Sequence, residues 1–352
     1  MTALASDTPS AHPGYEEVRA LRGKRSGLMM AVAVHRTVEG RALGGCRIWS
    51  YRTAEEVVSE AERLARSMTF KAAVAGLPVG GAKAVIATRP GKPLRGERRE
   101  QALRDFAELV ETFEGRYITA QDVGASLQDM TFLSRFTAHV AGHPVADGGS
   151  GDPSPYTAHG VEVGIRASVR GSLARRHVVI VGLGHVGSEL ARRLRAVGAR
   201  VTVTDLDQRR RAFAEDLGAA WVRPEEALAV EADVLAPCAL GEMIDRQAVD
   251  VLQVPVIAGA ANNQLAGDDV ADLLRDRGIV WAPDFVINAG GLIAVADELH
   301  GFDRGRVEGA IEGIADTLFE IYADADRAGT NTLIAAKELA RERLGGADGN
   351  DI

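Results

Sequence analysis

Two lysines separated by a glycine-rich stretch give the first chemical indication in this sequence. Lys71 and Lys83 lie twelve positions apart, and residues 76–83 read Gly-Leu-Pro-Val-Gly-Gly-Ala-Lys. An isolated lysine is usually a solvated surface charge. Here the glycines predict a turn that leaves room for a small substrate beside two cations. One ammonium could hold a carboxylate while the other works on the neighbouring carbon, which suits an α-amino or α-keto acid.

Lys83 is the expected acid–base group of this pair. Burial and a neighbouring cation lower the pKa of a lysine ammonium in general, and so fit it for proton transfer near neutral pH. Lys71 would stay protonated and bind the substrate carboxylate. Asp122 follows an expected strand over 117–120 and is placed to exchange a proton with the substrate amino group. Without the lysines, this aspartate would be interpreted as a turn or helix-capping residue.

Short apolar runs and a helix signal predict the elements that position these residues. Residues 28–34 and 84–87 are typical of buried strands, with Lys83 at the entrance of the second. Thr53 and Glu56 have capping-box spacing, which predicts the start of a helix. One face of that helix is apolar and consists of Val57, Ala61, Leu64, Ala65 and Met68. The helix therefore places Lys71 at its C-terminal end.

A glycine-rich stretch at residues 147–152 marks the expected boundary between two domains. After it, strands and helices alternate, as a doubly wound parallel sheet requires. We therefore predict an α/β protein with an N-terminal α/β catalytic domain over 1–150, whose first 13 residues form a flexible tail. A Rossmann-type domain is expected over 151–330, with strands at 177–181, 201–204 and around Val234, Val256 and Val280.

A dinucleotide fingerprint opens the second domain. Gly182, Gly184 and Gly187 follow a β-branched strand and precede a helix, as the phosphate-binding turn of a Rossmann unit requires. Asp205 ends the next strand, where a carboxylate would accept the ribose hydroxyls. Because this carboxylate would repel a 2′-phosphate, the sequence predicts NAD rather than NADP as cofactor. The nearby run of arginines, 209–211, weakens that preference.

Composition excludes several other classes of function. The net charge of −8 disfavours a nucleic-acid or anionic-membrane surface, and no apolar run approaches the length of a membrane span. The two cysteines, Cys46 and Cys238, have no metal-ligand spacing and fit a reducing compartment. No signal peptide is evident at the start of the chain. We therefore expect a cytoplasmic protein without a metal site.

At these residues the sequence resembles the leucine, valine and phenylalanine dehydrogenases, relatives of glutamate dehydrogenase. The resemblance runs from about residue 15 to 343 and rests on several separate motifs. Besides the lysines, Asp122 and the fingerprint, these are Leu43-Gly44-Gly45, Met68-Thr-Phe-Lys71, Ala236-Pro-Cys-Ala239-Leu-Gly241, Gly259-Ala-Ala-Asn262 and Pro283-Asp-Phe-Val-Ile-Asn288-Ala-Gly-Gly291.

The resemblance implies oxidative deamination of an L-amino acid to the 2-oxo acid and ammonia, and its reversal, in a homo-oligomer. Lys71 would bind the α-carboxylate with backbone at Gly44 and Gly45, Lys83 would activate the hydrolytic water, and Asp122 would assist proton transfer. Cofactor contacts are implied at His185, Val186, Ala239, Asn262 and Asn288, besides the fingerprint glycines and Asp205. The family also implies that a C-terminal helix, about 330–352, returns to the catalytic domain.

The side-chain pocket of such enzymes would be lined here by four apolar residues, Leu43, Ala120, Leu292 and Val295. A charged substrate side chain would lose its hydration there without a partner, so glutamate is disfavoured. Relatives that prefer phenylalanine tend to have glycine at the position of Ala120. We therefore rank leucine, valine and isoleucine first and phenylalanine second. The run 295–303 most resembles the valine dehydrogenases.

Three alternatives stay open at this point. The first is a dehydrogenase for an aromatic amino acid, with a pocket opened near Ala120 or Leu292. The second is a non-catalytic NAD-binding module, although Lys71, Lys83 and Asp122 are all retained. The third is a hydroxy-acid dehydrogenase, for which His143 and His159 are the candidate bases. We interpret both histidines as structural or surface residues.

Overall fold

The structure, a computed structural model, describes residues 12–345 except 90, 92 and 240. Most of the expected flexible tail, residues 1–11, therefore lies outside the described part of the chain. Two compact units are present. The first contains residues 1–152, 294–303 and 341–352, and the second contains residues 153–293 and 304–340.

A mixed five-stranded sheet forms the centre of the first unit, in the order β1-β2-β4-β3-β5. The pairs β1–β2 and β2–β4 are antiparallel, whereas β3 runs parallel to both β4 and β5. The parallel pairs bring the carboxyl ends of β3 and β5 to one edge. The strands are β1 (Glu17–Arg22), β2 (Met29–Arg36), β3 (Ala42–Ser50), β4 (Gly80–Thr88) and β5 (Tyr117–Gln121).

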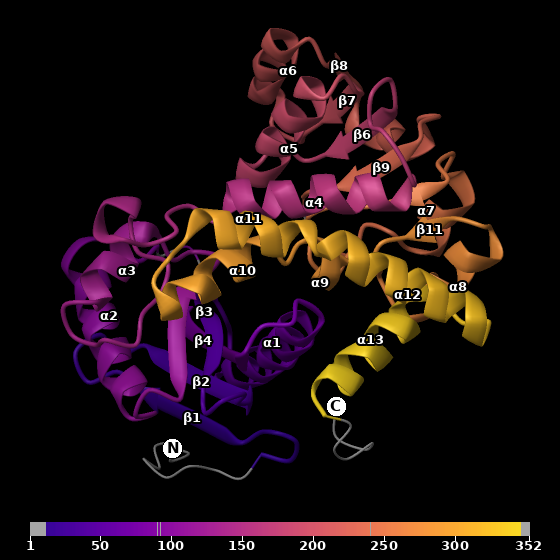
Figure 1. Ribbon diagram of the computed structural model, residues 1–352. Helices are drawn as coiled ribbons and strands as arrows, with labels where there is room; N and C mark the ends of the chain where they lie inside the picture. The colour runs from indigo at the N-terminus through magenta and orange to yellow at the C-terminus, as the bar shows by residue number, and fades with distance from the viewer. Residues whose placement is uncertain (1–11, 90, 92, 240, 346–352) are drawn as a thin grey trace. The chain divides into compact units, whose positions relative to one another are not determined.

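Helices cover both faces of this sheet (Figure 1). On one face, α1 (Ala54–Val74) packs Val57, Ala61 and Ala65 against alternate residues of β2 and β4. On the other face lie α2 (Gly96–Glu111) and α3 (Leu127–Leu133), over a larger apolar cluster that includes Phe106 and Met130. The alternation of side chains along each strand thus assigns every strand residue to the α1 face or the α2 face.

Local capping contacts set the starts of α1 and α3, and the first is the cap that the sequence predicts. Thr53 caps α1, and its side chain accepts a hydrogen bond from the Glu56 N–H at 3.2 Å. Ser126 and Asp129 form a reciprocal capping box at the start of α3. Lys71 lies in the last turn of α1.

The prediction of a turn at Gly80 and Gly81 is wrong, because both glycines belong to β4. A Cβ on Gly80 would lie 1.8 Å from the Arg36 carbonyl oxygen, and one on Gly81 would lie 2.0 Å from the Thr69 nitrogen. The space beside these glycines is therefore filled by the protein's own backbone rather than left for substrate. It follows that Lys83 lies inside the strand and not at its entrance.

Six parallel strands form the sheet of the second unit, in the order β11-β10-β9-β6-β7-β8. This is the predicted doubly wound arrangement, and the α/β two-domain fold class is confirmed. The strands are β6 (His177–Val181), β7 (Arg200–Thr204), β8 (Ala220–Trp221), β9 (Val234–Pro237), β10 (Val256–Ile257) and β11 (Val280–Trp281).

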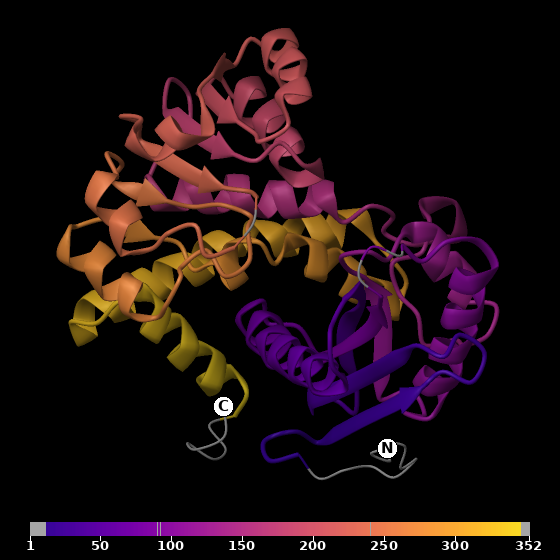
Figure 2. The ribbon, with the colours of Figure 1, turned by 180° about the vertical axis from the view of Figure 1, so that it is seen from behind.

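Helices alternate with these strands along the chain, and α4 lies beside α11 and α12 in both views (Figures 1 and 2). Val307, Ile311 and Leu318 are buried and form an apolar stripe along α11 and α12. The helices are α4 (Ser154–Ser168), α5 (His185–Ala196), α6 (Arg211–Leu217), α7 (Arg246–Val251), α8 (Asp269–Asp276), α9 (Asp284–Ile287), α10 (Gly290–Asp297), α11 (Arg304–Glu312), α12 (Ile314–Ala328) and α13 (Thr332–Arg343).

The return of the chain to the first unit differs from the expectation of a helix starting at about 330. Most of α13 stays with the second unit, because Leu333 belongs to its apolar cluster and the Thr332 hydroxyl donates to the Trp281 carbonyl at 2.8 Å. Only residues from 341 onward return, where Arg343 donates to the Val74 carbonyl at 2.5 Å. A second short segment, residues 294–303, also belongs to the first unit.

Candidate active site

Lys83 lies in β4 on the face of the first sheet that α1 covers. It pairs with Ala33 of β2, and both Ala33 and the next residue on the same face, Val85, pack against α1. The lysine is 5% exposed. A lysine is rarely this buried without a charged partner, and the structure supplies one at the end of β5, on the far side of β3.

Asp122 directly follows β5 and is the partner of Lys83. The Lys83 ammonium lies 3.1 Å from Asp122 Oδ2, and the Arg47 Nε donates to the same oxygen at 2.8 Å. Burial alone would raise the pKa of Asp122, but the charges of Lys83 and then Arg47 outweigh it and hold this pKa below its ordinary value. The Asp122 carboxyl is therefore ionised at neutral pH. Both cations thus contact the same carboxylate oxygen, Oδ2.

Arg47 and Glu60 extend this pair and were missed by the reasoning from sequence. The Arg47 Nη1 donates to Glu60 Oε1 of α1 at 2.7 Å, and the second Glu60 oxygen accepts from the exposed Arg63 at 3.0 Å. Arg47 lies two and four residues after Gly45 and Leu43, so it shares their face of β3. That period of two was a usable signal, since it placed a cation on the same face as Lys83.

The neighbouring strands leave no space for a side chain at Gly44 or at Gly45. A Cβ on Gly44 would lie 1.6 Å from the Ala82 carbonyl oxygen. One on Gly45 would lie 2.3 Å from the Gln121 carbonyl oxygen and 2.9 Å from the Asp122 Cβ. These glycines thus let β3 approach β4 and the end of β5, which brings Arg47 and Lys83 to Asp122. Contact of their backbone with a substrate carboxylate stays a prediction.

Lys71 is half-buried and is positioned by the packing of its helix against the sheet. Two residues earlier, the buried Thr69 hydroxyl lies 2.9 Å from His35 Nδ1 of β2, and the Thr69 backbone fits against Gly81. Burial, with Arg66 and Arg36 nearby, lowers the pKa of His35 to about 4, so this histidine is neutral at physiological pH. The C-terminal turn of α1 is thereby fixed to β2 and β4.

The four residues predicted to line the side-chain pocket are apolar, and three of them are buried. Leu43 is 1%, Ala120 6% and Val295 7% exposed, and Leu292 is partly buried. Ala120 pairs with Gly45, which shares the Leu43 face of β3, so Leu43 and Ala120 share the sheet face of Lys83. Val295 belongs to the returning segment 294–303, whereas Leu292 belongs to the second unit. Their role in binding stays a prediction.

Glu298 anchors that returning segment and was also missed from the sequence. One carboxylate oxygen accepts from the Ser150 N–H at 2.7 Å and from its hydroxyl at 2.5 Å. The other accepts from the backbone N–H groups of Gly142 at 2.9 Å and His143 at 3.2 Å. This acidic side chain therefore holds the segment 294–303, with Val295 three residues earlier, to residues 142–150 of the same unit.

The fingerprint glycines of the second unit form a tight turn between β6 and α5. Gly182 has a φ of +103°, and a Cβ on Gly187 would lie 2.0 Å from the Gly182 carbonyl oxygen, so both positions require glycine. Gly184, by contrast, is exposed with open space beside it, and α5 begins at the next residue, His185. Backbone N–H groups at an open helix N-terminus fit a pyrophosphate.

Asp205, at the end of β7, supports the same turn. Its Oδ2 accepts from the Leu183 N–H at 2.7 Å and its Oδ1 accepts from the Asp207 N–H at 2.8 Å. The carboxylate is half-buried and retains lone pairs for ribose hydroxyls. Of the nearby arginines, Arg209 is already paired with Asp207 at 2.8 Å.

The remaining predicted cofactor residues lie in α5, in the loops after β9 and β10, and at the end of α9. Ala239 lies against Gly182, and Val186 is the second residue of α5. The Asn288 Nδ2 donates to Asn262 Oδ1 at 2.9 Å and to the Ala260 carbonyl at 3.1 Å. Asn288 Oδ1 is buried without a hydrogen-bond partner among the described residues. Such an acceptor fits the carboxamide of a nicotinamide, so the residues present fit a dinucleotide.

The two histidines of the hydroxy-acid alternative have structural contacts. His143 Nε2 donates to the Val140 carbonyl at 2.9 Å. His159 Nε2 lies 2.9 Å from Glu312 Oε1, a pair between α4 and α11 that the sequence did not reveal.

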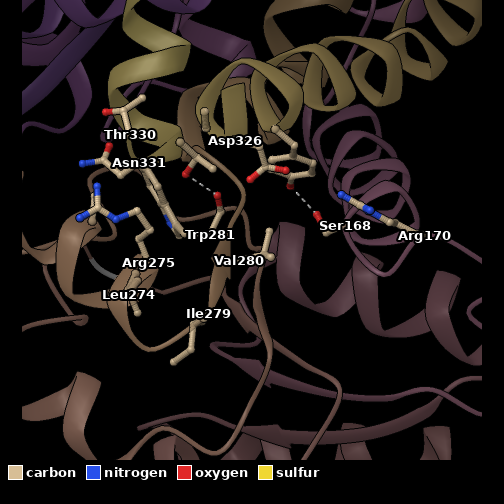
Figure 3. Close-up of a pocket in the computed structure, with 15 residues that line it drawn as sticks. Ser168, Arg170, Leu274, Arg275, Ile279, Val280, Trp281, Asp326, Thr330 and Asn331 are labelled. Carbon is tan, nitrogen blue, oxygen red and sulfur yellow. Dashed lines mark hydrogen bonds between the residues drawn. The ribbon is translucent and has the colours of Figure 1, made fainter. Parts of the chain in front are cut away.

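One cavity of about 280 Å³ lies in the second unit, between β11, α8 and α12 (Figure 3). Trp281, Arg275 and Asp326 are among its lining residues. Its buried polar groups are already paired, since the Ser168 and Tyr322 hydroxyls lie 2.7 Å apart. None of the predicted site residues lines it.

The described part of the chain shows neither a metal-ligand cluster nor a helix that could span a membrane. Over residues 12–345, with the three gaps given above, no group of three or more His, Cys, Asp or Glu residues could hold a metal ion. No helix in the same part of the chain has the length and hydropathy needed to cross a membrane.

Comparisons with known proteins cover nearly the whole chain. Residues 17–139 match the family model "Glu/Leu/Phe/Val dehydrogenase, dimerisation domain", and residues 202–347 match "Glutamate/Leucine/Phenylalanine/Valine dehydrogenase". A leucine dehydrogenase of Geobacillus stearothermophilus is 43% identical over 94% of this chain and 90% of its own length. A valine dehydrogenase of Streptomyces virginiae is 40% identical over 95% of both chains. The crystal structure of an L-tryptophan dehydrogenase from Nostoc punctiforme has a TM-score of 0.81 and 35% identity, with 95% of this chain and 96% of that chain covered.

Proposed function

Because the chain belongs to the glutamate/leucine/phenylalanine/valine dehydrogenase family of oxidoreductases, we propose that it oxidatively deaminates an L-amino acid with an aliphatic side chain, using NAD. The products are the 2-oxo acid, ammonium and NADH, and the reverse reaction is reductive amination. The observation that carries the proposal is the buried Lys83 ammonium 3.1 Å from the ionised Asp122, on the sheet face that also carries apolar Leu43 and Ala120.

The chain's own residues carry the binding and proton-transfer steps. Lys71 holds the substrate α-carboxylate, and Asp122 accepts a proton from the substrate ammonium, which frees the nitrogen lone pair. When bound, the nicotinamide supplies the acceptor for the hydride that leaves the substrate Cα. Lys83, as the neutral amine, takes a proton from the water that attacks the resulting imino carbon. Asp122 returns its proton to the carbinolamine nitrogen, and ammonia leaves as the carbinolamine hydroxyl gives its proton back to Asp122 and the C=O bond forms. A preorganised ion pair of this kind requires little reorganisation during the reaction.

The preference for aliphatic substrates rests on the chemistry of the four pocket residues. A glutamate side chain would bury its carboxylate without a partner, at a cost of several kcal/mol. The leucine and valine dehydrogenases among the relatives support an aliphatic substrate. The tryptophan dehydrogenase of similar fold favours an aromatic amino acid as the second candidate. One methyl group at Ala120 discriminates by about 1–3 kcal/mol.

NAD, rather than NADP, is the cofactor we assign to the second unit. The half-buried Asp205 carboxylate would repel a 2′-phosphate. Arg209, which could attract such a phosphate, already forms an ion pair with Asp207. The dimerisation-domain match supports a homo-oligomer. A cytoplasmic location stays a prediction from the sequence.

The test is NADH formation by purified protein across L-leucine, L-valine, L-isoleucine, L-phenylalanine, L-tryptophan and L-glutamate, each with NAD and with NADP. We expect turnover of the aliphatic amino acids with NAD. A preference for phenylalanine or tryptophan would retain the chemistry and contradict the pocket argument. Binding of NADH without turnover of any amino acid would favour the non-catalytic module.

A further inference from the structure

Arg47 connects two acidic groups that lie on different elements of the first unit. Its Nε donates to Asp122 Oδ2 at 2.8 Å, after β5, and its Nη1 donates to Glu60 Oε1 at 2.7 Å, on α1. The arginine side chain is 21%, Asp122 20% and Glu60 19% exposed. Such partial burial limits screening by solvent, so these contacts are stronger than surface ion pairs.

We infer that Arg47 is a positioning residue, which holds the Asp122 carboxylate against Lys83 and ties both to α1 through Glu60. This inference rests on the proposed function, in which Asp122 exchanges a proton with the substrate nitrogen. Arg47 does this from the strand between the two catalytic residues, since β3 pairs with both β4 and β5.

The geometry requires an arginine rather than any cation. Two different nitrogens of one planar guanidinium contact two carboxylates at once, whereas a lysine ammonium is a single point charge on a flexible stem. Gly45, in the same strand as Arg47, also makes room for this contact. A Cβ at Gly45 would lie only 2.9 Å from the Asp122 Cβ. Asp122 thus has its rotamer fixed from two sides, by Lys83 and by Arg47.

Several groups surround Asp122 and set its affinity for a proton. Lys83 faces it from β4 and Arg47 from β3, with Glu60 of α1 behind Arg47. Burial of the charge opposes both cations. Other titratable groups that interact with it are Cys46, Tyr51 and Tyr117. Removal of Arg47 would take away one of the two cations that contact Asp122 within the described ranges, and would raise the pKa of Asp122.

The test compares Arg47→Gln and Arg47→Lys with a matched control, Arg63→Gln. Arg63 is half exposed and contacts the other oxygen of Glu60, without a contact to Asp122. For Arg47→Gln we expect kcat to fall about 10- to 100-fold, as a displaced catalytic group would cause, with KM for the amino acid changed less than about 3-fold. The acid limb of kcat/KM should move to higher pH, and Arg47→Lys should restore that limb but not kcat. Arg63→Gln should match the wild type.

Crystal structures of the Arg47 variants give a readout that does not depend on turnover. We expect Asp122 to leave its contact with Lys83 or to occupy more than one rotamer in each. Normal kcat and an unmoved acid limb in both variants, or an unchanged Asp122 in the crystals, would overturn the inference. Lower stability alone, with an unchanged acid limb, would mean a merely structural role and would overturn it too. If the wild type turned over no amino acid, the proposed function would fail, and the crystal structures would still decide what Arg47 does.

Discussion

Gly81 controls how closely α1 approaches the sheet, and its replacement gives a sharp test of how Lys71 is placed. In Gly81→Ala, the new Cβ would lie 2.0 Å from the Thr69 nitrogen and 2.6 Å from the Ala65 carbonyl oxygen. Both atoms are helix backbone. Because real contacts of a Cβ begin near 3.0 Å, the helix must retreat by about 1 Å, the difference between 3.0 and 2.0 Å.

The retreat should reduce both stability and substrate binding. Overpacking of this kind costs about 1–3 kcal/mol of the free energy of unfolding. Since Lys71 lies two residues after Thr69, a 1 Å shift also misplaces the ammonium that holds the substrate carboxylate. We expect kcat/KM for the amino acid to fall about 100-fold. Binding of NADH should not change, because the fingerprint turn belongs to the other unit.

The assay is NADH formation over a range of L-leucine concentrations, together with NADH fluorescence titration and thermal unfolding. Gly309→Ala is the control, because Gly309 lies in α11 with no atom near its missing Cβ. That variant should be neutral or more stable by up to about 1 kcal/mol. If Gly81→Ala kept the wild-type kcat/KM and melting temperature, our explanation of this glycine would be refuted.

Three further predictions concern other parts of the chain. Asp205→Asn should lower the NAD over NADP preference at least about 10-fold, since the carboxylate that repels a 2′-phosphate is removed; an unchanged ratio of the two kcat/KM values would contradict this. Glu298→Ala should lower the free energy of unfolding by about 1–3 kcal/mol, because three backbone N–H groups lose their acceptor. The same variant should raise KM for leucine. Urea unfolding measures the first effect and initial rates measure the second. Burial opposes the ionisation of Asp105, but hydrogen bonds from Ser26 and Arg25 lower its pKa. The ionised carboxylate therefore stabilises the fold at pH values above the pKa that Asp105 has in the unfolded chain. This stabilisation is lost as the pH falls through the lower pKa that Asp105 has in the folded protein. Asp105→Asn should therefore lower the free energy of unfolding by about 1–3 kcal/mol at pH 7 and by less at pH 3. A loss of stability that does not depend on pH would argue against this assignment.

Local signals in the sequence predicted most of the elements, because local interactions decide them. The cap at Thr53 and the apolar stripe after it define α1, and the β-branched run before Gly182 defines β6. The family matches confirm the resemblance that separate motifs indicated. The Gly80 and Gly81 pair was misread, since a sequence does not show which backbone fills the space beside a glycine.

The parts of the site that the sequence did not reveal depend on contacts between elements. Arg47 and Glu60 meet across a strand and a helix, and nothing in their spacing of 13 residues pairs them. Glu298 reaches backbone more than 140 residues earlier in the chain. In contrast, Lys83 and Asp122 could be proposed from motifs, although their contact follows only from the order of the strands.

The measurement that tests the central claim most directly is the turnover of L-leucine by Lys83→Ala beside the wild type, with NADH affinity measured on both. We expect an active wild type and a kcat for the variant lower by at least about 10³-fold, since the acid–base group is lost. The dissociation constant for NADH should stay within about 2-fold, because no cofactor residue is changed. A variant with near-normal kcat would contradict the assignment of Lys83 and, with it, the proposed chemistry of the site.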